Sequence, residues 1–498
     1  MNVVMRGLPA TGAGLLLTTT AAFADVTAQQ VWQDWQGGVS GLGNVTMSAG
    51  SEAYADGVLT VTDFTVSSVN DEGEFSVAVA ELVFAEQGDG SVVVTSTPEQ
   101  TVEINGDDFH ARLTVTQTEA VTTVSGAPGA THYAFVIPQS VARLDEFLLE
   151  GEAMTASLDL IISGVSGDFG WEQTDEMLDM EYDFSIDRMD LKASLVSPED
   201  PGDFATLNGF MTELHSAAAL AIPANIDPDN PEEMFEAGFM IESNGSAGPA
   251  SLVFHLTEMG QTTDASFSMD GSRNHVSLDG EALAYDVSLS GLSGNASSPA
   301  MPFPVALSAG EIGLGLLLPM SSRDEPAPFS GRITLADVEV SEELWSIVDA
   351  GGVIPRDPAT LNLDISGTAT LTRNLYEDDV IEGMEPPGMF NTIDINTVDL
   401  AFGGATVHAD GAFTFNPDSA AVLDGMPMPE GRIDIAVSGI NGLMQKLGQI
   451  GLLPPEQAMA VTMGLGMFGV PSGDDALTST IVIDAAGQVT ANGMPLPF

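Results

Sequence analysis

Strand-length runs of alternating apolar and polar residues constrain this chain more than any other feature. Val58 to Val66 reads VLTVTDFTV, and Phe75 to Phe84 reads FSVAVAELVF before a Gly88-Asp89-Gly90 turn. Because successive side chains of a β-strand point to opposite faces, this alternation gives each strand one apolar and one polar face. The pattern returns at Phe109 to Thr118, Leu158 to Ser163, Tyr182 to Val196, Ser251 to Leu256, Ala265 to Met269, Ala284 to Leu289, Ile333 to Val340, Leu361 to Leu371, Ile393 to Phe402, Ala412 to Phe415, Ile433 to Val437 and Thr480 to Ile483. The sequence therefore predicts a mainly β (α+β) fold of long curved antiparallel sheets.

A few segments have helical spacing instead. Thr27 and Gln30 form a capping-box pattern that opens a short helix, and Gly37-Gly38 is expected to end it. Trp32 and Trp35 are expected to dock this helix onto a core, although such a pair is also compatible with a ligand surface. Four further helices are predicted at Phe204 to Leu220, Ser341 to Gly351, Ile440 to Gly451 and Pro455 to Phe468. We expect these short helices to cover the apolar face of the sheet.

Two of the predicted helices resemble each other. Leu344 to Pro355 reads LWSIVDAGGVIP and Leu443 to Pro454 reads LMQKLGQIGLLP, and a weaker third copy spans Phe210 to Pro223. This recurrence indicates a repeated unit of strands followed by a short helix. A stretch rich in Pro, Gly, Ser and Met at Ser293 to Pro328 marks a boundary. We therefore expect a β-rich N-terminal region at 25–300 and a β-rich C-terminal region with the repeated unit at 301–498.

Residues 1–24 have the pattern of a signal peptide. Arg6 precedes an apolar run from Leu8 to Ala22, and Ala22-Phe23-Ala24 fits the small-residue cleavage site. The chain has no Cys, and no later stretch of about 18 apolar residues lacks charged and turn residues. We expect a periplasmic or secreted protein of a bacterial envelope, with no disulfide and no stable membrane span.

The charge balance narrows the choice of partners. The chain carries 12 Lys and Arg against 72 Asp and Glu, which gives a formal net charge of -60. A surface this negative repels the phosphates of nucleic acids, so no nucleic-acid partner is expected. The hydrophobic share of 44% is that of a globular protein, so we interpret the acids as a solvated surface.

No motif of catalysis or cofactor binding emerges from the sequence. Nucleophilic catalysis needs an activated Ser or Cys, but there is no Cys and no Gly-x-Ser-x-Gly motif. The stretches Gly164 to Gly167 and Gly291 to Gly294 each contain a Ser between glycines and are expected to be turns at strand ends. The only lysines, Lys192 and Lys446, follow no Gly-rich phosphate loop. We therefore predict no catalytic residue, no cofactor and no enzyme activity.

No metal site is predicted from the sequence. None of the six His has another His within four residues, and His255 and His275 are interpreted as separate half-buried imidazoles rather than as a pair that meets across strands. Three acidic loops have the oxygen-rich composition of calcium sites: Asn225 to Glu233, Asn70 to Glu74, and Glu377 to Glu385. The first places carboxylates at Asp227 and Asp229 but lacks the Gly and the distant Glu of an EF-hand loop. We interpret these loops as chance clustering among 72 acids, with a structural calcium site as the alternative.

Methionine is abundant, with 23 residues. Met side chains fill irregular cores, and on a surface they suit adaptable hydrophobic ligands. We interpret those on or near apolar helix faces as core residues, with the ligand surface as the alternative: Met234, Met240, Met444, Met459, Met463 and Met467.

Both ends of the mature chain resemble one known family. The C-terminal part carries a strand ending in GAFTFNP, then GRIDIAVSGINGLMQKLGQIGLLPPEQAM and the closing GQVTANGMPLPF, and the mature chain opens with DVTAQQVWQDWQ. These segments resemble the bacterial domain-of-unknown-function family 2125, whose members are exported alphaproteobacterial proteins of similar length. The terminal pattern is also similar to that of AsmA-like envelope proteins, whose long curved sheets are associated with membrane assembly and lipid movement. Neither resemblance implies catalytic residues, and the chain lacks the N-terminal membrane helix typical of AsmA-like proteins.

These observations lead to two expectations for function. The first is an exported, non-enzymatic envelope protein with a scaffold or interaction role in the periplasm and another envelope protein as its partner. The alternative is a carrier that shelters a lipid or other hydrophobic ligand in a groove on a curved β-sheet. The two differ in whether the apolar face of the sheet is filled by the helices or left open.

Overall fold

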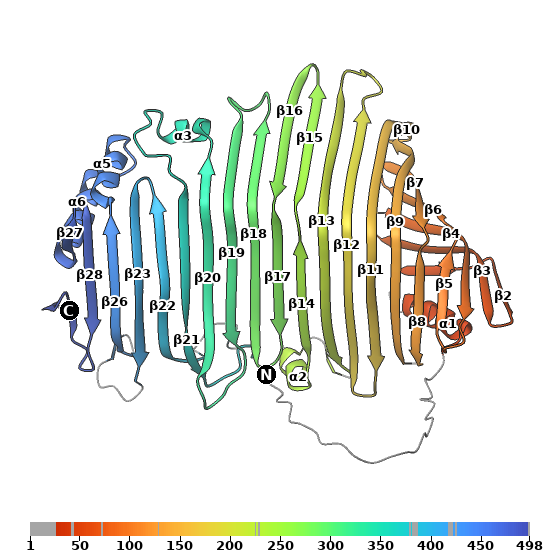
Figure 1. The fold of residues 1–498 in the computed structure, drawn as a ribbon, viewed down its shortest axis with the longest axis horizontal. Helices are drawn as coiled ribbons and strands as arrows, with labels where there is room; N and C mark the ends of the chain where they lie inside the picture. The colour runs from red at the N-terminus through yellow and green to blue at the C-terminus, as the bar shows by residue number, and fades with distance from the viewer. Residues whose placement is uncertain are drawn as a thin grey trace, which may run out of the picture.

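The structure is a computed structural model in which one long sheet dominates. It describes residues 26–496 apart from 41–43, 71–72, 128, 225, 228–229, 378–379, 381–386, 417–421 and 424–425. Within these residues, 28 strands join in a single sheet whose pairs are antiparallel, with five short helices around it (Figure 1). The predicted mainly β fold with a long antiparallel sheet is confirmed. The predicted signal peptide at 1–24 lies outside the described residues.

The first half of the chain supplies one helix at the start and one late in the run of strands. The elements are α1 (Ala28–Ser40), β1 (Val45–Ser48), β2 (Ser51–Ala55), β3 (Val58–Asn70), β4 (Gly73–Glu86), β5 (Val92–Ser96), β6 (Glu99–Gly106), β7 (Phe109–Thr118), β8 (Val121–Ala127), β9 (Ala130–Leu149), β10 (Glu152–Ala153), β11 (Thr155–Gln173), β12 (Met177–Val196), β13 (Phe204–Pro223), α2 (Pro231–Glu236), β14 (Met240–Ala247) and β15 (Ala250–Glu258).

The second half continues the same sheet. Its elements are β16 (Gln261–Met269), β17 (Gly271–Leu278), β18 (Ala282–Ser297), β19 (Val305–Pro319), β20 (Ala327–Val340), α3 (Glu342–Val348), β21 (Ala359–Leu371), β22 (Gly388–Phe402), β23 (Ala405–Phe415), β24 (Val422–Leu423), β25 (Met426–Pro427), β26 (Pro429–Ser438), α5 (Ile440–Gln449), α6 (Pro455–Phe468), β27 (Val470–Gly473), β28 (Ala476–Ile483), β29 (Val489–Ala491) and β30 (Met494–Pro495). β18 pairs with β19, so the strands of the regions 25–300 and 301–498 lie in one sheet.

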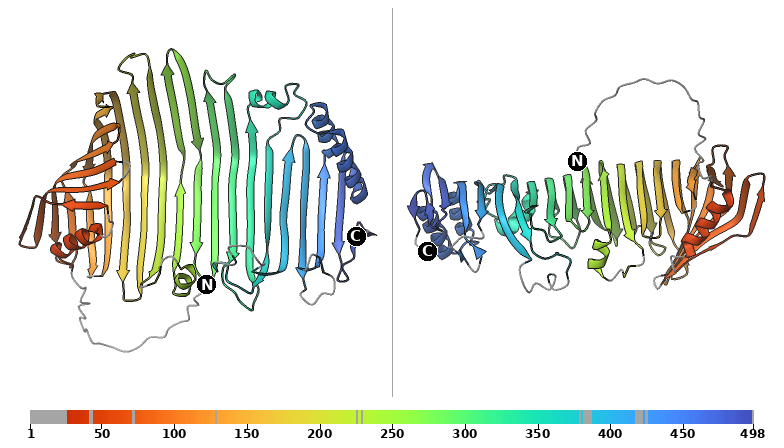
Figure 2. Two further views of the ribbon diagram at one scale, coloured as in Figure 1. Left: turned by 180° about the vertical axis from the view of Figure 1, so that it is seen from behind. Right: turned by 90° about the horizontal axis from the view of Figure 1, so that it is seen from below.

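The strands follow one another as a long meander. From β9 onward the order of neighbours is β9, β11, β12, β13, then β14 and β15 end to end, then β17 and β16 end to end, then β18 to β23, β26 and β28. Seen edge-on, the sheet is a single layer whose N-terminal strands turn out of the plane of the rest (Figure 2). Helices α1, α5 and α6 lie on the same side of this layer (Figure 2).

The main solvent-excluded core lies under α1. Trp32, exposed by only 2%, packs against Phe64 of β3 and Phe84 of β4, with ring centroids 5.7 and 5.9 Å apart. The helix begins as predicted, because the backbone N–H of Thr27 donates to Gln30 Oε1 and the N–H of Gln30 donates to Thr27 Oγ1. It continues to Ser40, so the prediction that Gly37-Gly38 ends it was wrong.

The strand pairing is interrupted at a glycine with positive φ in two of the strands. Gly164 (φ +65°) in β11 and Gly291 (φ +60°) in β18 adopt the left-handed conformation, and each lies under the side chain of an acid, Asp187 and Asp270 respectively. One residue on each strand of the pair is left unpaired there, so the register is kept. The apolar residues of a strand change between odd and even positions at this point while staying on one face. The prediction that Gly164 to Gly167 and Gly291 to Gly294 are turns at strand ends was therefore wrong, since both lie within strands.

One predicted helix is a strand. Phe204 to Leu220 forms most of β13, which pairs with β12 from Phe204 to Pro223. Its alanines favour a helix locally, but pairing with neighbours on both sides overrides this preference. The weak third copy of the repeated unit, Phe210 to Pro223, lies in the same strand and was also wrong. The other helix predictions are confirmed by α3, α5 and α6.

Candidate functional site

The candidate site is one continuous face of the sheet, which we call the apolar face. In the strand registers, one residue of each strand lies beside one residue of the next strand. These residues form a row that runs from the core under α1 to β28, the last long strand. This row is Val124, Tyr133, Phe169, Tyr182, Ala218, Ser243, Val276, Tyr285, Leu316, Gly331, Ile365, Ile395, Gly411, Ile433 and Ile481. No residue of the row carries a charge.

The C-terminal part of this face is the most apolar. A second row runs parallel to the first from β18 to β28, and all eight of its members are aliphatic: Leu289, Ile312, Leu335, Leu361, Leu400, Val407, Val437 and Leu477. Between the core under α1 and these strands, β14 and β17 present small or polar residues such as Gly245 and Asn274 on the same face. The surface from β18 to β28 is therefore the widest apolar part of the sheet.

This part of the apolar face is not covered by the described residues. Leu314 is 44% exposed, and Ile312, Leu316, Ile333 and Leu400 are between 37 and 39% exposed. A single-layer sheet normally buries its apolar side against a second layer. Exposed apolar patches larger than a few hundred Å² are rare on monomers and mark sites of interaction. The predicted cover by helices holds under α1, whereas the central strands keep an open apolar surface.

Helices α3 and α5 close one end of the open surface. The ring of Trp345 in α3 stacks on Phe402 of β22, with centroids 6.0 Å apart. Leu443 of α5 and Ile354 after α3 both pack at Gly403 in the β22–β23 turn, where φ is +60° and a Cβ would lie 2.8 Å from Leu443 and 3.0 Å from Ile354. The two resembling segments thus converge on one turn of the sheet.

A buried carboxylate holds the loop after α3. Asp349, 1% exposed, accepts hydrogen bonds from the backbone N–H of Val353 and Ile354 at 2.9 and 2.8 Å and from Arg356 Nη1 at 2.7 Å. Burial alone would raise its pKa, but these donors and the charge of Arg356 lower the pKa of Asp349 to about 2. Arg356 also pairs with Glu342 at 2.9 Å and lies 4.6 Å over the Trp345 ring. The network fixes the loop, and we assign it a structural role.

The opposite, polar face carries the ion pairs of the sheet. Asp286 of β18 pairs there with Arg332 of β20 at 2.5 Å, across Gly315 of the intervening β19. Asp399 pairs with His408 of the neighbouring strand at 2.5 Å. The hydrogen bond to Asp399 raises the pKa of His408. All of these side chains are about half-exposed, so they resemble solvated cross-strand pairs rather than a reactive centre.

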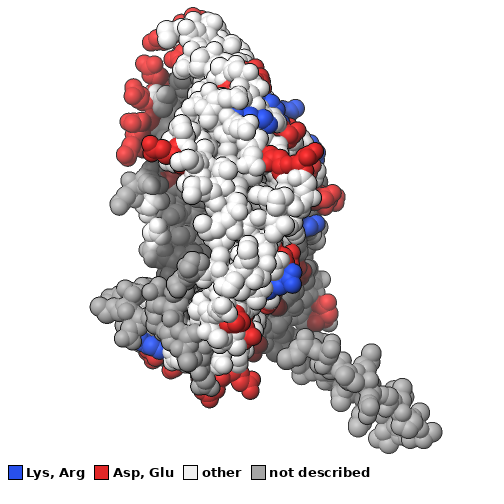
Figure 3. All heavy atoms as spheres, turned by 90° about the vertical axis from the view of Figure 1, so that its left-hand side faces the viewer, with Lys and Arg blue, Asp and Glu red and all other residues white. Residues whose placement is uncertain are grey.

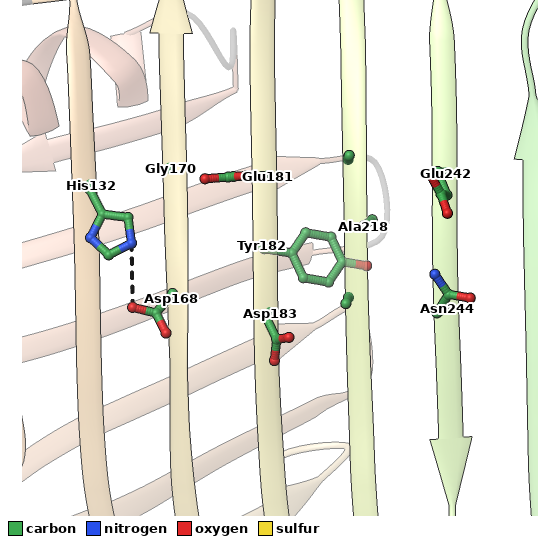
Figure 4. Close-up of a pocket in the computed structure, with 11 residues that line it drawn as sticks. His132, Asp168, Gly170, Glu181, Tyr182, Asp183, Ala218, Glu242 and Asn244 are labelled. Carbon is green, nitrogen blue, oxygen red and sulfur yellow. Dashed lines mark ion pairs between the residues drawn. The ribbon is translucent and has the colours of Figure 1, made fainter. Parts of the chain in front are cut away.

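A shallow hollow of about 370 Å³ lies on the polar face between β9 and β14 (Figure 4). His132 Nε2 lies 3.3 Å from Asp168 Oδ1 on one side, and Glu181, Asp183 and Glu242 surround a floor of alanines. The His132–Asp168 pair is about half-exposed, and no hydroxyl nucleophile among the described lining residues contacts it. This arrangement offers ionic contacts to a ligand.

The sequence candidates for metal binding are not brought together. His255 contacts Asp264 at 2.6 Å, whereas His275 contacts Asn244 at 2.8 Å, so the two imidazoles have separate partners. Asn230 of the first acidic loop caps α2 through the N–H of Glu233; Asp229 lies outside the described residues, as do 71–72 and most of 378–386. Within the described part of the chain, no group of three or more His, Asp or Glu could hold a metal ion.

Sequence reasoning identified the apolar residues of the strands but not the open surface they form. Which face a residue takes follows from alternation, whereas the width of the surface follows from the neighbour order of the strands.

In the described residues, no helix is both long and apolar enough to cross a membrane.

Comparison with known proteins identifies a family. The family model described as "Uncharacterized protein conserved in bacteria (DUF2125)" matches residues 235–497. The match begins in α2 and spans the strands β14 to β30, which include the open part of the apolar face. No curated protein matches the chain.

Proposed function

The chain belongs to the DUF2125 family of proteins conserved in bacteria, and on that premise we propose that it is an exported, non-enzymatic envelope protein that shelters the acyl chains of a lipid. The proposed binding surface is the apolar face from β18 to β28. Export is proposed from the leader pattern at 1–24.

The observation that carries this proposal is the open and uncharged character of the surface. Eight strand positions contribute an unbroken row of aliphatic residues from Leu289 to Leu477, and large side chains in the neighbouring row, such as Leu314, remain accessible. Removal of such a surface from water is favourable by roughly 25 cal/mol per Å². A ligand composed of hydrocarbon gains this energy without leaving a polar group unpaired.

The dimensions of the surface suit an acyl chain. β19 has 15 residues and is therefore about 50 Å long at roughly 3.3 Å per residue. One leaflet of a bilayer contributes about 15 Å of hydrocarbon, half of the roughly 30 Å core. An acyl chain can therefore lie along the strands at full length.

The first test is solvent extraction of the purified full chain followed by mass spectrometry of the extract, together with titration of the neutral dye Nile red. The triple variant Leu314→Thr/Leu316→Thr/Ile333→Thr keeps strand-forming residues but makes the centre of the surface polar. We expect co-purified lipid and saturable dye fluorescence for the wild type, and at least a fivefold loss of both for the variant.

The matched control changes exposed apolar residues of the polar face. Val136→Thr/Val253→Thr alters side chains that are 52% and 45% exposed, so it should leave lipid and dye binding unchanged. Protein that is free of lipid and elutes as a dimer would instead favour the scaffold role, because a second sheet would then cover the apolar face. Equal losses in both variants would also count against the proposal.

A further inference from the structure

Helix α6 lacks the amphipathic pattern of a helix that packs on its own protein. Its sequence, PEQAMAVTMGLGMF, contains Glu456 as the only charged residue, and none of its side chains is buried. Met459, Met463 and Met467 are 62, 63 and 59% exposed, and Val461 is 43% exposed. A helix that is apolar on all sides is normally buried in a protein core or in a membrane. α6 is on the surface of the described structure, so its natural surroundings are missing from the isolated chain.

The position of α6 is fixed by the sheet. The hydroxyl of Ser479 in β28 and the side-chain amide of Asn492 both donate to the carbonyl oxygen of Phe468 at the end of α6, at 2.6 and 2.7 Å. Ser479 lies opposite Ile435 in the register of the apolar face, so α6 is anchored at the C-terminal end of that face. Its exposed methionines therefore continue the apolar surface beyond the last strands.

The charge distribution separates this end from the rest of the molecule. The chain as a whole has a net charge of -60 and is repelled by anionic surfaces. The centre of the C-terminal end, in contrast, is largely uncharged, with acidic side chains along its margins (Figure 3). An uncharged apolar projection at one end of an acidic molecule complements a zwitterionic bilayer, whose interior accepts hydrocarbon and whose surface carries no net charge.

The length of α6 distinguishes a bilayer from the other candidates. An apolar helix of 10–14 residues is too short to span the hydrocarbon core and is typical of a buried helix or an interfacial segment. α6 has 14 residues and is not buried. A protein partner would cover one stripe of such a helix and leave the opposite side in water, whereas lipid can surround it.

We propose that α6 inserts into the outer part of a zwitterionic bilayer and docks the chain there. This proposal does not rest on lipid binding by the apolar face.

The test is flotation of the purified full chain with phosphatidylcholine vesicles in a density gradient. The variant Met459→Gln/Met463→Gln/Met467→Gln changes only exposed side chains, and Met259→Gln is the control, because Met259 is 83% exposed in the β15–β16 turn. We expect the wild type and the control to float and the triple variant to lose at least tenfold in vesicle-bound fraction. A blue shift in the emission of a dye on Cys introduced at Met463 would report insertion.

Two outcomes would overturn the proposal. Failure of the wild type to bind vesicles would do so, as would a wild-type dimer that the triple methionine variant converts to a monomer, since α6 would then be an interface between copies. The apolar-face variant Leu314→Thr/Leu316→Thr/Ile333→Thr should still float. If the wild type floats but yields no extractable lipid, the proposed function fails and the docking of α6 stands. If it yields lipid but does not float, the docking of α6 fails and the proposed function stands.

Discussion

At the scale of single residues, Asp349 is the group whose ionisation should matter most. Its carboxylate accepts two backbone N–H groups and one guanidinium N–H, and its pKa is lowered from 3.8 to about 2. A group whose pKa is lower in the folded state stabilises that state above its unfolded pKa, and this contribution is lost as pH falls through the folded pKa. The loop 349–356 should therefore stay ordered down to about pH 4 and loosen between about pH 4 and 2.

Hydrogen exchange of the Val353 and Ile354 amides, corrected for intrinsic rates, measures this effect directly. Asp349→Asn should exchange at least tenfold faster at neutral pH and lose the acid transition. Asp357→Asn, one residue from Arg356 but outside the network, is the control and should behave as the wild type. An unchanged transition in Asp349→Asn would assign the acid effect to other carboxylates.

At the scale of elements, α1 should contribute a large share of the stability of the N-terminal strands. Trp32 fills the space between Phe64 and Phe84, and its Nε1–H meets no hydrogen-bond acceptor among the described residues. Trp32→Ala should cost about 3–5 kcal/mol, the usual loss for a buried aromatic side chain. Trp32→Phe should cost clearly less, since it keeps an aromatic ring and removes the buried unpaired N–H. Urea unfolding followed by far-UV circular dichroism compares them, and equal losses would argue against packing as the cause.

The same elements show how far the sequence predicts this fold. Helices α1, α3, α5 and α6 were predicted because their signals are local: a capping box at Thr27 and Gln30, acids in a first turn, and Pro455 at a helix start. β13 was missed because its alanine-rich sequence favours a helix until β12 and β14 pair with it. The glycines Gly164 and Gly291 were taken for turns because a glycine with positive φ occurs in turns and, here, within strands.

The candidate site could be predicted only in part for a related reason. Alternation placed Ile333 in a strand with one apolar face, since it depends on neighbours in sequence. Leu314 was not assigned in this way, because it lies in the stretch Ser293 to Pro328 that was interpreted as a boundary and in fact contains β19. That this face stays open depends on where the helices come to rest: α3 and α5 lie at one end of the strands, and α6 lies beside β28 at the C-terminal edge of the sheet (Figure 1). Local signals carry no information about that placement.

At the scale of the whole molecule, separation of charge from apolar surface leads to a prediction about salt. Carboxylates on the polar face and in the loops leave the chain with a net charge of -60, and the sheet holds them on one extended layer. Their mutual repulsion destabilises the folded state, and salt shortens its range from about 30 Å at 0.01 M to about 8 Å at 0.15 M. The midpoint of thermal unfolding should therefore rise by several degrees over this range of NaCl. Calcium chloride at the same ionic strength is the control: an equal rise attributes the effect to screening, whereas a larger rise would indicate specific cation binding by the acidic loops. A midpoint that stays constant or falls with NaCl would mean that cross-strand pairs such as Asp286–Arg332 and Asp399–His408 outweigh the repulsion, because salt weakens attraction and repulsion alike.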